Sequence, residues 1–318
     1  MSDFKRVDIK TGYLCNNWCR FCVQAHNRDA GNRTTDEIKK AIIDAKKKGA
    51  SGVVFTGGEF TIRKDSIELV KFAKKLGYEV IQIQTNGRRF SSMNYLRKIF
   101  SAGVTEFSPA LHGHTPQIHD YLTRSPGSWS QTVKGIRYVK KLGGRVVANS
   151  VLVKPNYRYL PDIADLFVNL GADQFQFAFM HALGNAKVNF ESLMARYKLA
   201  EPYIKEGLKI ASDAGLKVMA EAVPFCMISG YEEFITELHV PETMIKERDF
   251  WIDDFEKARK KGGKLLFNQC KKCKFRLICE GPWKEYPEKL GDFEFEPVLG
   301  DVLKSNKELV DKWRNYYC

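Results

Sequence analysis

The chain has 318 residues, and its 51 Lys and Arg against 38 Asp and Glu give a formal net charge of +13. Hydrophobic residues make up 44% and charged residues 28%, which excludes an intrinsically disordered chain. No run approaches the ~18 consecutive apolar residues of a membrane span. Residues 1–6 lack the apolar stretch of a signal peptide. We therefore expect a cytoplasmic protein that does not enter a membrane.

Between residue 7 and about residue 215, short apolar runs alternate with helical patterns. Strands are expected over residues 7–14, 52–56, 80–84, 105–111, 145–153 and 174–179. Helices are expected after a capping box at Thr34 and Glu37, over 65–76 and 92–102, from 128 onward, and over 160–170 and 192–214. Six βα units predict a parallel sheet, either open and doubly wound or curved into an incomplete barrel. In both folds, ligands bind at the carboxyl ends of the strands.

The pattern changes near residue 216. A seventh strand-like run over 216–223 leads to Cys226, and a charged stretch over 241–261 has a helical pattern. The remainder is rich in aromatic and charged residues and predicts irregular structure. We therefore expect two modules, residues 1–215 and residues 216–318.

The eight cysteines say more about function than the charge does. Three of them, Cys15, Cys19 and Cys22, have the spacing C-x3-C-x2-C directly after the first strand, and we call them the motif cysteines. A tight group in a large chain without an export signal favours a metal site over disulfides. Three thiolates can bind three irons of a cubane [4Fe–4S] cluster and leave the fourth iron open. A zinc ion held by the motif cysteines and His26 is the alternative.

This motif resembles the signature of the radical SAM superfamily, in which three cysteines hold a [4Fe–4S] cluster whose open iron binds S-adenosylmethionine. Phe21, directly before the third cysteine, fits the same signature. Gly57, Gly58 and Glu59 follow the second strand, where the family carries a Gly-Gly-Glu motif that binds the methionine part of the cofactor. Glycines admit close approach of a ligand, and a carboxylate accepts hydrogen bonds from an ammonium group. The resemblance covers about residues 7–215 and implies an α/β fold, a partial (β/α)6 TIM-like barrel.

Further positions follow the family pattern less closely. Asn86 ends the third strand, as in many relatives, and Asn149 and Ser150 lie on the fifth strand, where the family often places a polar side chain near the ribose. The fourth strand departs from the pattern. Many relatives have Ser-Leu-His-Gly there, whereas this chain has Ala-Leu-His-Gly over 110–113. The departure removes the serine contact that the resemblance would otherwise imply.

A second group of cysteines lies nearer the C-terminus. These four auxiliary cysteines are Cys226, Cys270, Cys273 and Cys279. Four thiolates suffice for a closed cubane or for a structural zinc site. The spacing C-x2-C-x5-C of the last three resembles the auxiliary-cluster module of the SPASM/twitch subgroup, although Pro282 stands where a full module has a further cysteine. The resemblance implies one auxiliary [4Fe–4S] cluster, with Cys318 as the alternative to Cys226.

Other candidate groups also have structural explanations, and no arrangement of Ser, His, Asp or Cys marks a catalytic nucleophile. His112, His114 and His119 follow the fourth strand and are expected in a loop, with a metal site or a proton relay as the alternative. His181 after the sixth strand has the same status. The lysine-rich segment, residues 257–264 together with Lys271, Lys272 and Lys274, could offset the charge of a cluster, attract an acidic substrate or nucleic acid, or form a solvated surface.

The resemblance implies an enzyme that cleaves S-adenosylmethionine reductively to a 5′-deoxyadenosyl radical, which abstracts hydrogen from a substrate. The subgroup points to a peptide or protein side chain as substrate; a nucleoside, tRNA or small metabolite is the alternative. The first cysteine stands at residue 15, so we expect no separate leader-binding domain, which weakens the case for a ribosomal peptide. An electron donor such as ferredoxin or flavodoxin is expected. A non-catalytic zinc or iron–sulfur protein that binds RNA is the alternative of another class.

Overall fold

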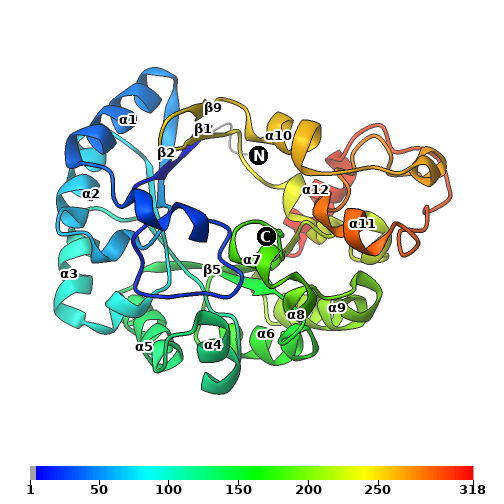
Figure 1. The fold of residues 1–318 in the computed structure, drawn as a ribbon, viewed down its shortest axis with the longest axis horizontal. Helices are drawn as coiled ribbons and strands as arrows, with labels where there is room; N and C mark the ends of the chain where they lie inside the picture. Colours follow the sequence, from blue (N-terminus) through cyan, green and yellow to red (C-terminus); the bar gives the residue numbers. More distant parts are fainter. Residues whose placement is uncertain (1–4, 318) are drawn as a thin grey trace.

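The computed structural model describes residues 5–317, and one nine-stranded sheet forms its centre (Figure 1). The strands follow the order β7-β6-β5-β4-β3-β2-β1-β8-β9. All neighbours are parallel except β8 and β9. The strands are β1 (Lys5–Lys10), β2 (Ala50–Thr56), β3 (Val80–Thr85), β4 (Glu106–Pro109), β5 (Arg145–Leu152), β6 (Gln174–Phe179), β7 (Lys217–Glu221), β8 (Thr243–Lys246) and β9 (Trp251–Ile252). The sheet is not closed, so the predicted α/β fold of the partial-barrel type is confirmed.

The longer helices that follow β1 to β6 form an arc along one side of the sheet (Figure 1). The helices of the described chain are α1 (Thr35–Lys47), α2 (Ser66–Lys75), α3 (Met93–Ser101), α4 (Pro116–Thr123), α5 (Ser128–Lys141), α6 (Leu160–Asn169), α7 (Asn185–Val188), α8 (Phe190–Leu193), α9 (Tyr197–Asp213), α10 (Phe255–Ala258), α11 (Glu285–Leu290) and α12 (Lys307–Asn315). None of the helices in the described part of the chain combines the length and the apolar character needed to cross a membrane.

The start of α1 confirms the predicted capping box. The backbone N–H of Glu37 donates to Oγ1 of Thr34 at 3.2 Å, and the backbone N–H of Thr34 donates to Oε2 of Glu37 at 2.6 Å. These two bonds satisfy donors that the first helical turn leaves without partners. The helix therefore begins where the sequence predicts.

Strand β6 shows how the sequence separates the two faces of the sheet. Phe175 stacks on Phe167 of α6 with ring centroids 4.7 Å apart, and Phe179 stacks on Tyr197 of α9 at 3.7 Å. Gln176, on the opposite face, is only partly buried. Because successive strand residues alternate between faces, the apolar side chains pack under the helices and the polar ones face the inside of the curved sheet.

Segment 241–261 differs from its predicted helix, because it contains β8, β9, the single helical turn α10 and the start of a π-helical turn, Arg259–Gly263. β8 pairs in parallel with β1. Pro241 and the β-branched Thr243 and Ile245 disfavour a helix, and the edge of the sheet supplies backbone partners that the helical pattern does not reveal. With β7 beside β6, the sheet runs across residue 215. The division into two modules at that residue stays a prediction.

Side chains from the end of the chain cover the outer edge of β7. The backbone N–H of Val218 donates to the hydroxyl of Tyr317 at 3.3 Å, and Nε1 of Trp313 in α12 donates to the carbonyl of Val218 at 3.2 Å. These bonds pair backbone groups that an edge strand leaves open. The C-terminal helix is thereby fastened to the sheet.

Candidate functional site

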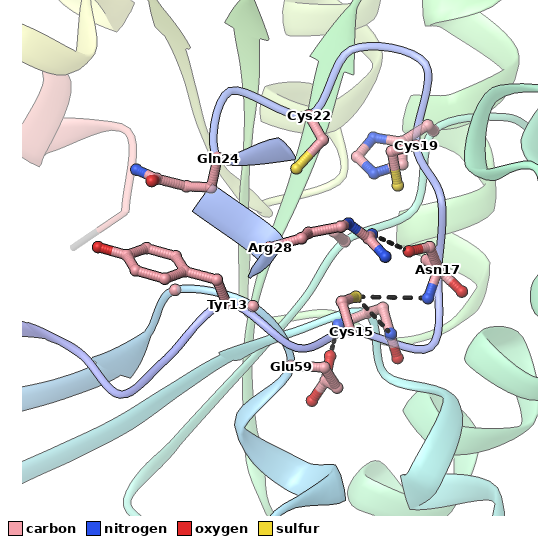
Figure 2. Close-up of a pocket in the computed structure, with 13 residues that line it drawn as sticks. Tyr13, Cys15, Asn17, Cys19, Cys22, Gln24, Arg28 and Glu59 are labelled. Carbon is pink, nitrogen blue, oxygen red and sulfur yellow. Dashed lines mark hydrogen bonds between the residues drawn. The ribbon is translucent and has the colours of Figure 1, made fainter. Parts of the chain in front are cut away.

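The motif cysteines lie on the loop after β1 and surround one pocket (Figure 2). The residues that line it are Tyr13, Cys15, Asn17, Cys19, Cys22, Gln24, Arg28, Gly57, Gly58, Glu59, Asn86, Ala110 and His112. They come from the segments that follow β1, β2, β3 and β4, at the carboxyl ends of these strands. The structure therefore brings the motif cysteines together with Gly57, Gly58, Glu59 and Asn86, at the end of a parallel sheet where ligands bind.

The chemistry of the motif cysteines fits an iron–sulfur cluster. Burial raises the pKa of all three thiols, to about 11 for Cys15. Cys22 and Cys15 raise the pKa of Cys19 further, so the three sulfurs act on one another. Thiolates in this pocket need nearby positive charge, and the irons of a cluster supply it. A [4Fe–4S] cluster with three thiolate ligands is the group that these residues fit.

The zinc alternative gains no support from the structure. His26, its fourth ligand, is exposed and does not line the pocket. Within residues 5–317, no three His, Cys, Asp or Glu side chains are grouped so that they could hold a single metal ion.

Bonds to distant segments hold the cysteine loop in place. Nη1 of Arg88 donates to the carbonyl of Asn16 at 2.5 Å and to Oδ1 of Asn17 at 2.8 Å. The backbone N–H of Trp18 donates to the carbonyl of Thr123 at 2.9 Å. Sequence reasoning missed Arg88 because a single arginine carries no motif, and its partners lie about 70 residues earlier in the chain.

The glycines after β2 also have a packing role that the sequence did not reveal. A Cβ on Gly58 would lie 2.2 Å from the carbonyl oxygen of Leu14, and one on Gly57 would lie 2.4 Å from that of Gly12. The N–H of Gly58 donates to the carbonyl of Gly12 at 2.7 Å. Gly57 also has a φ of +114°, which favours glycine. The glycines therefore leave space for the backbone that leads into the cysteine loop. They also line the pocket, and their contact with the cofactor stays a prediction.

Changing Gly58 to alanine should displace the cysteine loop, because no side chain can move to relieve a clash with backbone. We expect the variant to bind at most half of the parent's iron after anaerobic reconstitution. Gly262 has open space around its Cβ position and no positive φ, so Gly262→Ala is the matched control and should bind iron as the parent does. Equal iron content in the two variants would contradict the packing role of Gly58.

Glu59 is buried and receives hydrogen bonds from two strand ends. Its Oε1 accepts from the backbone N–H and the hydroxyl of Thr61, at 3.0 and 2.6 Å, and from the hydroxyl of Thr85 at 2.7 Å. Its Oε2 accepts from the backbone N–H of Asn86 at 2.7 Å. The carboxylate thus links the ends of β2 and β3, and only Oε2 has room for a further donor.

Three predicted cofactor contacts lie outside the residues that line the pocket. Phe21 is buried and packs edge-on against His112, with ring centroids 4.7 Å apart. Asn149 and Ser150 are neighbours on β5, so their side chains point to opposite faces of the sheet. Their side-chain oxygens have no hydrogen-bond partner within the described chain, and Ser150 is fully buried. Contact of these residues with the cofactor stays a prediction.

Two of the histidines after β4, His112 and His119, are held in a neutral form. The backbone N–H of Val151 donates to Nδ1 of His112 at 3.0 Å, and the backbone N–H of His112 donates to Nδ1 of His119 at 3.1 Å. Because an amide can only donate, each ring carries its proton on Nε2. Burial lowers the pKa of His119 to about 4 and that of His112 well below its usual range. A proton relay through these rings near pH 7 is therefore not supported.

All four auxiliary cysteines line a second pocket. Burial raises the pKa of Cys226, and the other three thiols raise it further, so the four sulfurs lie near one another. The backbone N–H groups of Phe267 and Gly281 each donate to one of these sulfurs at 3.4 Å. Hydrogen bonds to the sulfurs tune cluster sites, and four thiols fit a closed cubane. Cys318, the alternative ligand, lies outside the described residues.

A buried ion network joins the second pocket to the sheet. Glu280, next to the last auxiliary cysteine, forms two hydrogen bonds of 2.9 Å with Arg259. Lys264 lies 3.4 Å from Glu280 and also pairs with Glu237. Glu237 accepts from the backbone N–H of Ala222, just after β7, at 2.9 Å. Arg259 and Lys264, two cations of the lysine-rich segment, are thus internal and structural.

Comparisons with known proteins agree with this geometry. An AdoMet-dependent heme synthase from Oleidesulfovibrio alaskensis is 30% identical over 174 residues, which are 54% of this chain and 44% of that protein. A PqqA peptide cyclase from Rhodopseudomonas palustris is 28% identical over 190 residues, 59% of this chain and 50% of that protein. The chain spans about half the length of the curated relatives it matches. SuiB from Streptococcus suis, solved with bound S-adenosylmethionine, has a similar fold, with a TM-score of 0.66 and 16% identity over 95% of this chain and 78% of SuiB.

The family model of the radical SAM superfamily matches residues 9–167. This span contains the motif cysteines, the Gly57–Glu59 turn and Asn86, which the fold gathers around one pocket. The chain belongs to the radical SAM superfamily, whose members bind a [4Fe–4S] cluster and S-adenosylmethionine.

Proposed function

We propose that the chain is a radical SAM enzyme of the SPASM/twitch type that acts on a peptide or protein side chain. The observation that carries this proposal is the convergence of the motif cysteines, Gly57–Glu59 and Asn86 on one pocket. The convergence of the four auxiliary cysteines on a second pocket supports an auxiliary cluster.

When bound, the cluster and S-adenosylmethionine supply a 5′-deoxyadenosyl radical that takes a hydrogen atom from the substrate. The chain's own residues bind and orient these groups. The motif cysteines would hold three irons, and Asn86 would limit the pocket on the side of β3. His112 is buried but lines the pocket, and it keeps its proton on Nε2, which makes this nitrogen a hydrogen-bond donor.

A peptide substrate is supported by the relatives. One of them is a peptide cyclase, and SuiB has been solved with its precursor peptide SuiA. The heme synthase supports a small molecule as the second candidate. The relatives named above give no support to the RNA-binding alternative.

Release of 5′-deoxyadenosine from S-adenosylmethionine, after anaerobic reconstitution and reduction with dithionite, tests the activity. The substrate class is tested with a peptide fraction and a small-molecule fraction from cells grown in D2O. Deuterium that enters 5′-deoxyadenosine only from the peptide fraction would support the proposal. Transfer only from the small-molecule fraction would favour the second candidate.

Changing Cys279 to alanine should remove the auxiliary cluster alone. The parent should hold about eight irons per chain and the variant about four, because each cubane contributes four. Cys279 lines the second pocket and not the first, so 5′-deoxyadenosine release without substrate should stay within about twofold of the parent. An iron content in the variant equal to that of the parent, or only about four irons per chain in the parent, would contradict the auxiliary cluster.

An electron donor such as ferredoxin or flavodoxin completes the proposal, because the cluster must be reduced by a one-electron carrier. Lys271 and Lys272 are exposed beside the auxiliary cysteines and give this face a positive charge that suits an acidic protein. We also propose the cytoplasm as the compartment, because a reducing compartment keeps closely spaced cysteines available as metal ligands.

A further inference from the structure

Arg28 brings a permanent positive charge to the motif cysteines. Of the 13 residues in the described chain that line this pocket, it is the only lysine or arginine. Figure 2 shows its side chain pointing into the space that the three cysteines surround. The guanidinium is close enough to act on each thiol, and it opposes the larger effect of burial on their pKa values.

Two contacts hold this charge on the cysteine loop itself. Arg28 lies in a short 3-10 helix, Ala25–Ala30, that follows the third motif cysteine. Its guanidinium lies 4.0 Å from the centroid of the Trp18 ring, and one N–H donates to the carbonyl of Asn17. Asn17 and Trp18 both lie between Cys15 and Cys19 in the chain, so the charge of Arg28 is fixed relative to the sulfurs. A guanidinium has five N–H donors, and Asn17 uses one in the described structure.

The carboxylate in the pocket does not neutralise Arg28. Glu59 is the only Asp or Glu among the lining residues of the described chain, and it accepts from Thr61, Thr85 and Asn86. Its carboxylate is therefore bonded to the ends of β2 and β3 and forms no ion pair with Arg28 in the described structure, although its charge adds to the effect of burial in raising the pKa of Cys15. The positive charge of Arg28 is left to act on whatever anion occupies the pocket.

We propose that Arg28 is a positioning residue that stabilises the reduced state of the cluster held by the motif cysteines. This rests on the proposed function, because it requires a cluster on these thiols. A thiolate-bound cluster is anionic, and reduction adds one electron from an external donor without making or breaking a bond. The added negative charge lies beside a fixed cation, so the reduced state gains more than the oxidised state, and the reduction potential rises.

The test is a reductive titration of the complete protein, followed by EPR. The cluster of the motif cysteines is the one whose signal changes when S-adenosylmethionine is added, because four auxiliary thiolates leave no open iron. Arg28→Gln should lower the ratio of reduced to oxidised cluster about tenfold at a fixed potential. This change equals a fall of about 59 mV in the reduction potential of a one-electron couple. Arg28→Lys, which keeps the charge, should lower the ratio less than threefold.

Arg20 supplies the matched control. It lies on the same loop but stacks on Tyr121 at 4.2 Å and does not line the pocket. Arg20→Gln removes the same formal charge and should leave the ratio unchanged, so an equal shift in both glutamine variants would overturn a local role. An unchanged potential in Arg28→Gln with weaker S-adenosylmethionine binding would overturn it too, and would assign Arg28 to the cofactor.

Two further outcomes are decisive. If Arg28→Gln does not retain iron, Arg28→Lys carries the test, and a shift of tenfold or more in that variant contradicts the proposal. If the parent protein shows no signal that responds to S-adenosylmethionine, the proposed function fails, which is distinct from a failure of the role of Arg28.

Discussion

Changing Cys15 to alanine will lower the release of 5′-deoxyadenosine from S-adenosylmethionine by at least about 1,000-fold, to the rate without enzyme. Each motif cysteine can bind one iron, and Cys15 lines the pocket together with Cys19 and Cys22. With two thiolates left, the pocket has too few ligands to hold a cubane with one open iron. Chromatography of the reaction after reduction with dithionite measures the release directly.

Iron content separates loss of the site from loss of the fold. Cys15→Ala should retain about four irons per chain, held by the auxiliary cysteines in their separate pocket. It should also retain the parent's far-ultraviolet circular dichroism, because Cys15 lies on a loop and not in the sheet. A Cys15→Ala variant that still releases 5′-deoxyadenosine at the parent rate would refute the central proposal.

Local patterns in the sequence were sufficient for most of the elements. All six predicted strands form, and the capping box at Thr34 begins α1 as predicted. These signals act within one turn or one strand, so they do not depend on the rest of the fold. The helix predicted over segment 241–261 was wrong for the opposite reason. β8 forms because it pairs with β1, which lies more than 230 residues earlier in the chain.

The residues of the two pockets show the same contrast between local patterns and long-range contacts. Spacing predicted the motif cysteines and the auxiliary cysteines as two groups, because ligands of one metal centre recur at short, characteristic intervals. Spacing did not reveal Arg28 or Arg88, whose roles depend on which loops the fold brings together. The Gly-Gly-Glu turn was located correctly, but the space around Gly58 is set by the backbone of residues 12–14, which no pattern within the turn shows.

The open side of the sheet explains how one chain carries two cysteine pockets. β7 is one edge strand, whereas β8 lies beside β1 near the other edge. The segment between them must therefore pass from one side of the sheet to the other, and it carries Cys226 and Glu237. Cys226 contributes to the second pocket, and Glu237 ties Lys264 to the end of β7. The auxiliary pocket is thus anchored to the same sheet that positions the motif cysteines.

Glu59→Ala should lower the free energy of unfolding by about 3–5 kcal/mol, even without any cofactor. The change leaves three buried donors, two on Thr61 and one on Thr85, and the partly buried backbone N–H of Asn86 without an acceptor. Glu59→Gln keeps one acceptor oxygen and should cost about 1–2 kcal/mol. Urea unfolding of the iron-free protein, followed by circular dichroism, measures both values.

Glu68 is the matched control, because its carboxylate is more than half exposed and pairs only with Lys39 at the surface. Glu68→Ala should change the free energy of unfolding by less than about 1 kcal/mol. The family resemblance assigns Glu59 to the ammonium group of the cofactor, whereas its hydrogen bonds assign it to the link between β2 and β3. If Glu59→Gln unfolds like the parent but binds S-adenosylmethionine more weakly, contact with the cofactor is its main role. If stability falls as expected, weaker binding follows from the displaced ends of the two strands.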